Sequence, residues 1–234
     1  MTGFLIVLSV TACNKESHQD SSEPYVKPVD MSLRVLDVMA GAESGVSCTS
    51  EDDSLPSSGT TESDGSVSLR VSGNEKFTVQ TINGGYMDHS VTGMAGTEDF
   101  SVVSLMASRE LTEQIYSMLD ISADASKGIL IVALDDPLLR PAIGARAAVD
   151  LNNDGAFVFG STAVEWSDTV PSGGSGFVAF PNIQTGLAQL TVTAPDGQKC
   201  WFSPGGPHSS TAAAEVNITA DEVTVALFTC DVEE

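Results

Sequence analysis

Residues 60–71 read Thr-Thr-Glu-Ser-Asp-Gly-Ser-Val-Ser-Leu-Arg-Val. Asp64 and Gly65 tolerate the positive φ of a tight turn, so this pair predicts a reversal of the chain. Across residues 67–71, apolar and polar side chains then alternate, which is the period of a strand with one buried face. We therefore expect a turn that leads into a half-buried β-strand.

Runs of the same kind recur along the chain, separated by turn clusters such as residues 72–74, 83–85 and 195–197. The other runs expected to be strands are residues 33–35, 77–82, 128–132, 157–159, 177–180, 190–193, 216–218 and 223–225. Strands this short are stable only when two sheets bury each other's apolar faces. The sequence therefore predicts an all-β chain built from β-sandwiches.

Residues 108–119 interrupt this pattern of short strands, because their apolar residues at 111, 115, 118 and 119 have helical spacing. Ser108 can cap the amides at the start of such a helix. We expect residues 107–127 to be a linking helix and loop. The predicted organisation is two tandem β-sandwich domains of immunoglobulin-like or transthyretin-like type, residues 31–106 and 128–234, joined by this short helix.

Both halves carry short motifs of one known family. The first half has a strand at residues 32–37, the Asp64-Gly65 turn and Gly84-Gly85-Tyr86; the second has Pro-Ala-Ile-Gly-Ala at 141–145 and a glycine turn before an aromatic strand at 177–180. These motifs resemble the carboxypeptidase regulatory-like (transthyretin-like, prealbumin-like) domain, over residues 31–105 and 128–231. The second copy departs from that pattern, because Ser175-Gly176 replaces Asp-Gly. A generic immunoglobulin-like tandem is the alternative.

The charge balance excludes several partners. The chain has 234 residues with 10 Lys and Arg against 32 Asp and Glu, a formal net charge of −22. Such a charge opposes contact with nucleic acid and anionic lipid headgroups, so no nucleic-acid partner is expected. With 41% hydrophobic and 18% charged residues, the chain can build a core and does not read as a disordered acidic tail.

The N-terminal residues resemble an export signal. An apolar run at residues 4–10 leads into Val10-Thr11-Ala12-Cys13, which resembles the lipobox of bacterial lipoproteins. The resemblance implies a signal peptide over residues 1–13 and a lipid anchor on Cys13. One departure is that no Lys or Arg lies between Met1 and the apolar run. The alternative is a buried first strand with an ordinary cysteine.

The polar residues 14–30 are expected to form a flexible tether between this anchor and the folded part. Asn14 stands where inner-membrane lipoproteins of enterobacteria have Asp, which favours the outer membrane. We therefore expect a cell-envelope protein, lipid-anchored, on the periplasmic or the surface face.

The chain has four cysteines: Cys13, Cys48, Cys200 and Cys230. With Cys13 lipidated, three remain and one must stay unpaired. We expect a disulfide between Cys200 and Cys230, in an oxidising compartment; pairing with Cys48, or reduced buried thiols, are the alternatives. No CxxC motif occurs and the three histidines are scattered, so zinc and thiol-redox chemistry are not expected.

Residues 150–155 match the first half of a calcium loop, with Asp150, Asn152 and Asp154 at alternate positions before Gly155. Position twelve of that loop is Ser161, where a bidentate Glu is needed. Calcium is therefore a candidate cofactor at these three residues, and a metal-free turn between strands is the alternative.

No catalytic motif is complete. Residues 173–177 fail the G-x-S-x-G pattern because Phe177 replaces the last glycine, and no HExxH occurs.

Trp166 lies among polar residues and is the candidate exposed contact for a sugar ring, whereas Trp201 beside Cys200 is expected to pack in the core.

These observations predict a non-catalytic envelope lipoprotein that acts as a binding or scaffolding module. Its expected partners are the membrane, through the lipid anchor, and an envelope protein or glycan. Two alternatives remain: a calcium- or carbohydrate-binding surface module, and an accessory domain of an envelope hydrolase or a small hydrolase.

Overall fold

A computed structural model describes residues 27–37, 41–52, 55–161, 163–204 and 212–232. The predicted signal peptide with Cys13 and most of the predicted tether lie outside the described residues. The first strand, β1 (Pro28–Asp37), begins three residues before the predicted domain boundary at residue 31, so residues 28–30 belong to the sheet rather than to the tether.

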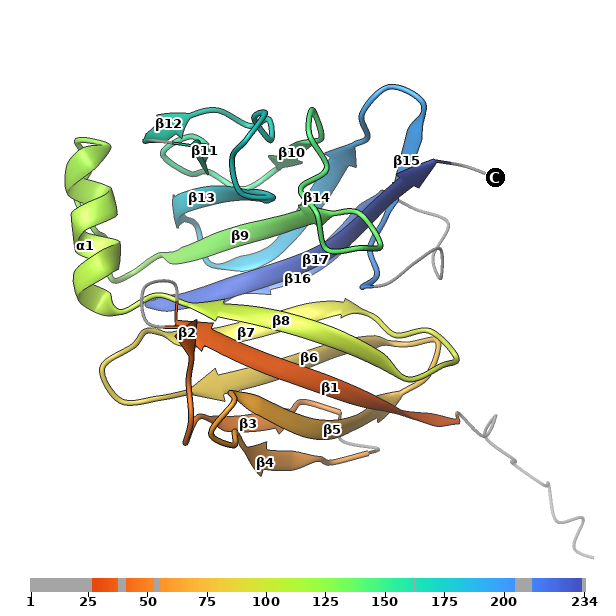
Figure 1. The fold of residues 1–234 in the computed structure, drawn as a ribbon. Helices are drawn as coiled ribbons and strands as arrows, with labels where there is room; N and C mark the ends of the chain where they lie inside the picture. The colour runs from red at the N-terminus through yellow and green to blue at the C-terminus, as the bar shows by residue number, and fades with distance from the viewer. Residues whose placement is uncertain (1–26, 38–40, 53–54, 162, 205–211, 233–234) are drawn as a thin grey trace, which may run out of the picture.

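The described chain is all-β apart from one helix, and its strands form three sheets (Figure 1). The N-terminal sheet contains β2 (Gly41–Ala42), β1, β5 (Ser66–Ser72) and β8 (Phe100–Met106). The C-terminal sheet contains β10 (Arg146–Val149), β14 (Gly186–Thr193) and β16 (Ala213–Ile218).

Between them lies a central sheet of ten strands. Its order is β12 (Val164–Trp166), β11 (Phe157–Phe159), β13 (Phe177–Ile183), β9 (Gly128–Asp135), β17 (Glu222–Val232), β7 (Asp88–Met94), β6 (Lys76–Ile82), β3 (Ser47–Ser50) and β4 (Ser58–Thr60), with β15 (Gln198–Trp201) pairing to the end of β17.

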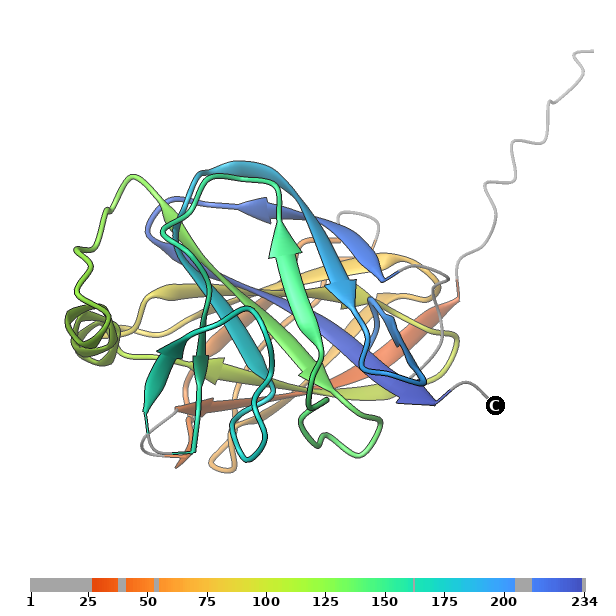
Figure 2. The ribbon, with the colours of Figure 1, turned by 90° about the horizontal axis from the view of Figure 1, so that it is seen from above.

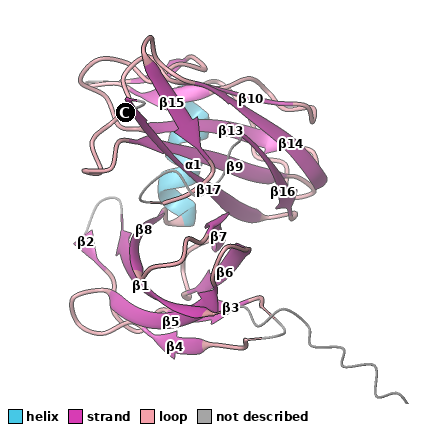
Figure 3. Cartoon of the chain, turned by 90° about the vertical axis from the view of Figure 1, so that its right-hand side faces the viewer, coloured by secondary structure: helices cyan, strands magenta, loops and turns pink. Residues whose placement is uncertain are grey.

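The two outer sheets cover opposite faces of the central sheet and enclose two separate apolar cores. Alternation along β9 reflects this arrangement: Leu130, Val132 and Leu134 lie in the core under the C-terminal sheet, while Ile129 and Ala133 lie in the core on the other face. The side view separates the two resulting sandwiches (Figure 3). The predicted fold of two consecutive β-sandwiches is confirmed.

The last described strand joins the two sandwiches. β17 pairs in parallel with β7 of the N-terminal half and with β9 of the C-terminal half. Ala226, for example, lies opposite Thr92 on one side and Val132 on the other. The two sandwiches therefore share one continuous sheet, a connection that the prediction of two successive domains did not contain.

The turn expected at Asp64-Gly65 is confirmed. Gly65 has φ +78°, and its carbonyl accepts a 2.9 Å hydrogen bond from the amide of Val35. A β-carbon at Gly65 would lie within 2.4 Å of the Val35 carbonyl oxygen, so glycine is required both for the backbone angle and for this close approach. Along β5 after the turn, Val67, Leu69 and Val71 are buried as predicted.

Gly65→Ala is expected to lower the free energy of unfolding by about 3 kcal/mol, since left-handed strain of about 1–2 kcal/mol adds to a clash with fixed backbone. Urea denaturation measures the loss. Gly45 is the matched control, because it has the same φ of +78° and a β-carbon added there would meet nothing within 4 Å. Equal losses for Gly65→Ala and Gly45→Ala would show that the close approach has no energetic cost.

The predicted helix is confirmed as α1 (Arg109–Met118), which lies at one end of the molecule while β17 runs towards the other (Figure 2). The Ser108 hydroxyl accepts a 3.1 Å hydrogen bond from the amide of Leu111, as the capping prediction required. Arg109 holds the helix to the β16–β17 turn through a bidentate pair with Asp221, at 2.9 and 3.0 Å. No helix in the described part of the chain is long and apolar enough to cross a membrane.

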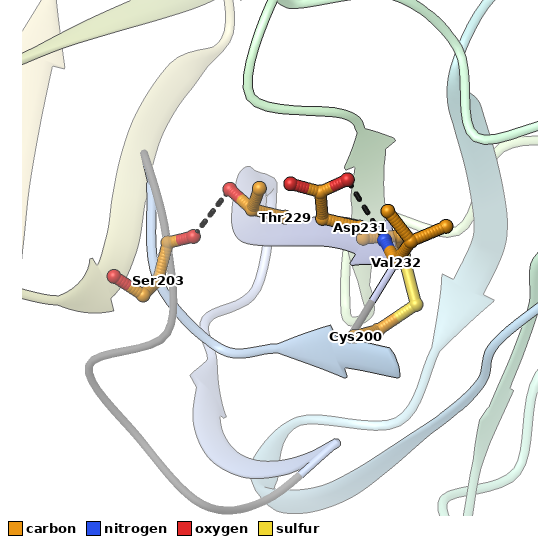
Figure 4. Close-up of a disulfide and its surroundings, with 6 residues drawn as sticks. Cys200, Ser203, Thr229, Asp231 and Val232 are labelled. Carbon is orange, nitrogen blue, oxygen red and sulfur yellow. Dashed lines mark hydrogen bonds between the residues drawn. A yellow bond between two sulfur atoms is a disulfide. The ribbon is translucent and has the colours of Figure 1, made fainter. Parts of the chain in front are cut away.

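The predicted disulfide is confirmed between Cys200 on β15 and Cys230 on β17, which lie opposite each other in the register (Figure 4). Next to it, the Thr229 hydroxyl donates a 2.7 Å hydrogen bond to the Ser203 carbonyl. Cys48 is a buried free thiol, and burial raises its pKa to about 11.

The aromatic residue that packs in the core beside this disulfide is Phe202, whose ring centroid lies 5.2 Å from that of Phe228. Trp201 is only half-buried. The prediction that Trp201 packs in the core was therefore wrong, and the next residue, Phe202, packs there instead. Neighbouring residues of an extended chain point to opposite faces, so only one of the two can face the core.

Candidate binding groove

The N-terminal sheet ends at β8 and leaves part of the central sheet uncovered. Beyond β8, one face of strands β9, β13 and β11 carries only apolar side chains along its middle. We call this face the apolar shelf, formed by Ile129, Ile131, Phe157, Phe159, Phe177 and Ala179. Ile131, Phe159 and Phe177 remain partly exposed, so the shelf is an incompletely covered apolar surface on a rigid sheet.

Two adjoining pockets lie over the shelf, with volumes of about 270 and 340 Å³. They share Val103 and Leu105 of β8, together with Ser175 and Phe177. Residues of α1 line one side of the first pocket, and the second pocket extends along β8 towards Pro204. We refer to the two pockets together as the groove.

Asp135 provides the only carboxyl group among the described residues that line the groove. It is the last residue of β9 and shares the face of Ile129 and Ile131, because alternate residues of a strand point to the same side. Burial, with a smaller contribution from the charge of Asp136, raises the pKa of Asp135 to about 6. No hydrogen bond among the described residues stabilises its charged form.

The hydroxyl of Ser175 is a second polar group at the groove. It is buried and has no hydrogen-bond partner within the described residues. A serine nucleophile needs an adjacent base, and no described side chain takes that position here. The groove therefore combines apolar walls with one carboxyl and one hydroxyl group.

Asp135→Asn is expected to stabilise the fold at neutral pH. The folded-state pKa of Asp135 lies above that of the unfolded chain, so its contribution is most favourable below pH 4 and is lost as the pH rises through 6. The gain from Asp135→Asn should grow from near zero at pH 4 to about 1–2 kcal/mol at pH 7.5, after allowance for solvent screening.

Urea denaturation of both proteins at several pH values measures this difference. Burial lowers the pKa of His89 to about 4, so His89 favours folding at higher pH, opposite to Asp135. Subtracting the stability-against-pH curve of the wild type from that of the variant removes this effect, because both proteins contain His89. A gain from Asp135→Asn that does not change between pH 4 and 7.5 would contradict the burial of this carboxyl group.

Asn182 fixes the loop after α1 against the sheet. Its side-chain amide nitrogen donates to the carbonyl of Ser122 at 2.8 Å and to the carboxylate of Asp154 at 2.6 Å. Its side-chain oxygen accepts from the amide of Asp124 at 3.0 Å. Because Asn182 is buried, these bonds hold the wall of the groove that α1 forms.

The candidate calcium ligands make hydrogen bonds within the fold. Asp150 accepts a 2.8 Å hydrogen bond from the amide of Gln189, and Asp154 accepts the bond from Asn182. The backbone carbonyl of Asn152 accepts from Gln184. Nowhere in the described ranges do three His, Cys, Asp or Glu side chains gather as a metal site. Calcium at Asp150, Asn152 and Asp154 stays a prediction.

Trp166 lies next to the apolar shelf. It is the last residue of β12, pairs with Phe157 across the strands, and is 47% exposed. Residues that pair in an antiparallel sheet share a face, so its indole extends the shelf outwards. The sequence singled out Trp166 as an exposed aromatic residue, but it did not reveal the groove, Asp135, or the contribution of Val103 and Leu105.

The fold and groove define a class of protein: an all-β chain of two sandwiches that share one sheet, with an apolar groove beside the junction. No known protein family matches the chain, and no curated protein matches its sequence.

Solved structures with distant similarity include two pilins and a third bacterial protein. The minor pilin GBS52 of Streptococcus agalactiae is 12% identical, with 88% of this chain and 96% of that chain covered and a TM-score of 0.31. The shaft pilin SpaA of Lactobacillus rhamnosus GG is 13% identical, with 90% of this chain and 100% of that chain covered and a TM-score of 0.26. The Bacillus anthracis TIE protein is 12% identical, with 86% of this chain and 33% of that chain covered and a TM-score of 0.28. This chain therefore spans about a third of that protein's length. Likeness at this level carries no conclusion about function.

Proposed function

We propose that this protein is a non-catalytic binding module of the bacterial cell envelope, held at the membrane through a lipid on Cys13. The observation that carries the proposal is the groove, which offers a partly exposed apolar surface on a rigid sheet and, among its described residues, lacks a nucleophile with an adjacent base. The disulfide between Cys200 and Cys230 supports an oxidising compartment. The lipobox-like residues before Cys13 support the anchor.

Mass spectrometry of the protein extracted from membranes tests the anchor. We expect a chain that begins at Cys13 and carries a diacylglyceryl group, and a Cys13→Ala variant that leaves the membrane fraction. An uncleaved, unmodified N-terminus would reject this part of the proposal. A panel of peptide, ester and glycoside substrates tests the absence of catalysis, and turnover that is lost in Ser175→Ala would overturn it.

Glycan binding is the second candidate function, and the exposure of Trp166 favours it. In this case a sugar ring would stack on the indole at the outer end of the shelf. Titration with cell-wall glycan fragments should then quench tryptophan fluorescence in the wild type and leave Trp166→Ala unchanged. Quenching that survives this substitution would assign the signal to Trp201 and remove the candidate.

Calcium would add a third component to such a module. A bound ion is expected to raise the melting temperature in proportion to the logarithm of its concentration. Melting curves in CaCl₂ and in EDTA measure this, with Asp150→Asn as the variant that should lose the shift. Identical curves in both solutions would remove calcium from the proposed function.

A further inference from the structure

We propose that the groove accepts an extended segment of a partner protein, which adds as a strand to the open edge of β8 and places a Lys or Arg against Asp135. This inference rests on the proposed binding function and names the class of partner. Three independent observations carry it: the state of the β8 edge, the surface beside that edge, and the charge in the groove.

β8 is an unprotected edge strand. It pairs with β1 on one side, and no strand of the described chain pairs with its other side. Its seven residues contain neither a charged residue nor proline. Natural sheets usually protect their edges with charges, proline or very short strands, because open backbone groups recruit further strands.

The other edges in the described sheets have such protection. β2, β4 and β12 have three residues or fewer. The remaining edge strands β5, β10, β15 and β16 carry charged residues: Arg70, Arg146, Lys199 and Glu215. The open and uncharged edge of β8 is therefore an exception within the described part of this molecule, and it borders the groove.

The apolar shelf occupies the position that one further strand would cover. The N-terminal sheet covers the central sheet up to β8, and the shelf continues the same apolar face beyond it. An added strand would lie about 4.8 Å from β8, and seven residues would extend about 23 Å along it. Every second side chain would then point onto the shelf and complete the core that the sheet leaves open.

The charge of the groove selects the chemistry of the partner. Asp135 is a half-buried carboxyl that makes no hydrogen bond to a described residue, and no Lys or Arg occurs among the described residues that line the groove. A cationic side chain within a desolvated site would pair with it directly. A second copy of this chain is disfavoured as the occupant, since each copy carries a net charge of −22 and repels the other.

A fluorescein-labelled peptide, Thr-Val-Thr-Val-Thr-Lys-Thr-Val-Thr, tests the inference with the full chain. Its Val and Lys side chains share one face, so all of them can meet the shelf. We expect saturable binding by fluorescence anisotropy. Asp135→Asn should weaken the binding of this peptide about 10-fold. A peptide with norleucine in place of Lys should bind more weakly, and Asp135→Asn should not change its affinity.

Val103→Lys places a charge beside the added strand and should abolish binding. Leu187→Lys is the matched control, because Leu187 is an exposed apolar residue on β14, outside the groove. Circular dichroism confirms that both variants are folded. Equal effects of Val103→Lys and Leu187→Lys would overturn the assignment to the groove.

Methylation of peptide amides separates strand addition from general apolar binding. Alternate amides of a strand point to opposite edges, so methylating the set that faces β8 should abolish binding, and methylating the other set should not. Hydrogen exchange should slow at the amides of β8 when the peptide binds. Equal tolerance of both methylated peptides would overturn strand addition.

Two further results would also overturn the inference. One is the absence of peptide binding to a protein that is correctly lipidated at the envelope, which rejects the strand partner and leaves the proposed anchoring intact. The other is a dimer in sedimentation velocity that Val103→Lys dissociates, which would identify a second copy as the occupant.

Discussion

Ala226→Asp is expected to unfold both sandwiches together and to lower the free energy of unfolding by at least about 4 kcal/mol. Ala226 is fully buried in the centre of β17, between β7 and β9. None of the described buried residues is a Lys or Arg, so a carboxylate there would have no counter-charge among them. Because β17 is a central strand of the shared sheet, its loss removes one pairing partner from each half of the molecule.

Hydrogen exchange measured by mass spectrometry distinguishes a joint loss from a local one. We expect β6 in the N-terminal half and β13 in the C-terminal half to lose protection at the same urea concentration. Val232→Asp is the control on the same strand, since Val232 is 59% exposed, and it should cost less than about 0.5 kcal/mol. A variant in which β6 keeps its protection would show that the two sandwiches are stable separately.

Replacing both Cys200 and Cys230 by Ser is expected to lower the free energy of unfolding by about 3–4 kcal/mol. The disulfide closes a loop with a sequence separation of 30, and the chain-entropy account gives this magnitude for a loop of such length. The loss should be largest at β15, which pairs with β17 and with no other described strand. Urea denaturation of the double variant measures the total effect.

Cys48→Ala provides the comparison, because Cys48 is also buried but has no disulfide partner. Its loss is expected to cost about 1 kcal/mol, the value for removing a small buried group. If the double variant and Cys48→Ala are destabilised equally, the disulfide contributes no more than any buried sulfur atom.

Local features of the fold could be predicted from the sequence because their causes are local. The alternation at residues 67–71, the turn at Gly65 and the cap at Ser108 each depend on a few neighbouring residues. The Cys200–Cys230 pair could be predicted because both cysteines lie in short apolar, strand-like runs, only 30 residues apart in sequence.

The shared sheet and the groove could not be predicted in this way. Alternation shows which face of a strand is buried but not which strand lies beside it, so the place of β17 between β7 and β9 was missed. One signal was present: residues 129–134 are apolar at consecutive positions, and so are residues 225–228, as in strands covered on both faces. Asp135 was overlooked because a carboxyl at the end of a strand usually lies in solvent.

The position of β17 also has a consequence for biosynthesis. The strand that pairs with both halves of the molecule is the last one that a ribosome makes among those described, so each half lacks one of its strand pairings until β17 is translated. Contacts this distant in sequence delay folding. Under the export that we propose for this protein, such late folding would keep the nascent chain unfolded for passage through a secretion channel.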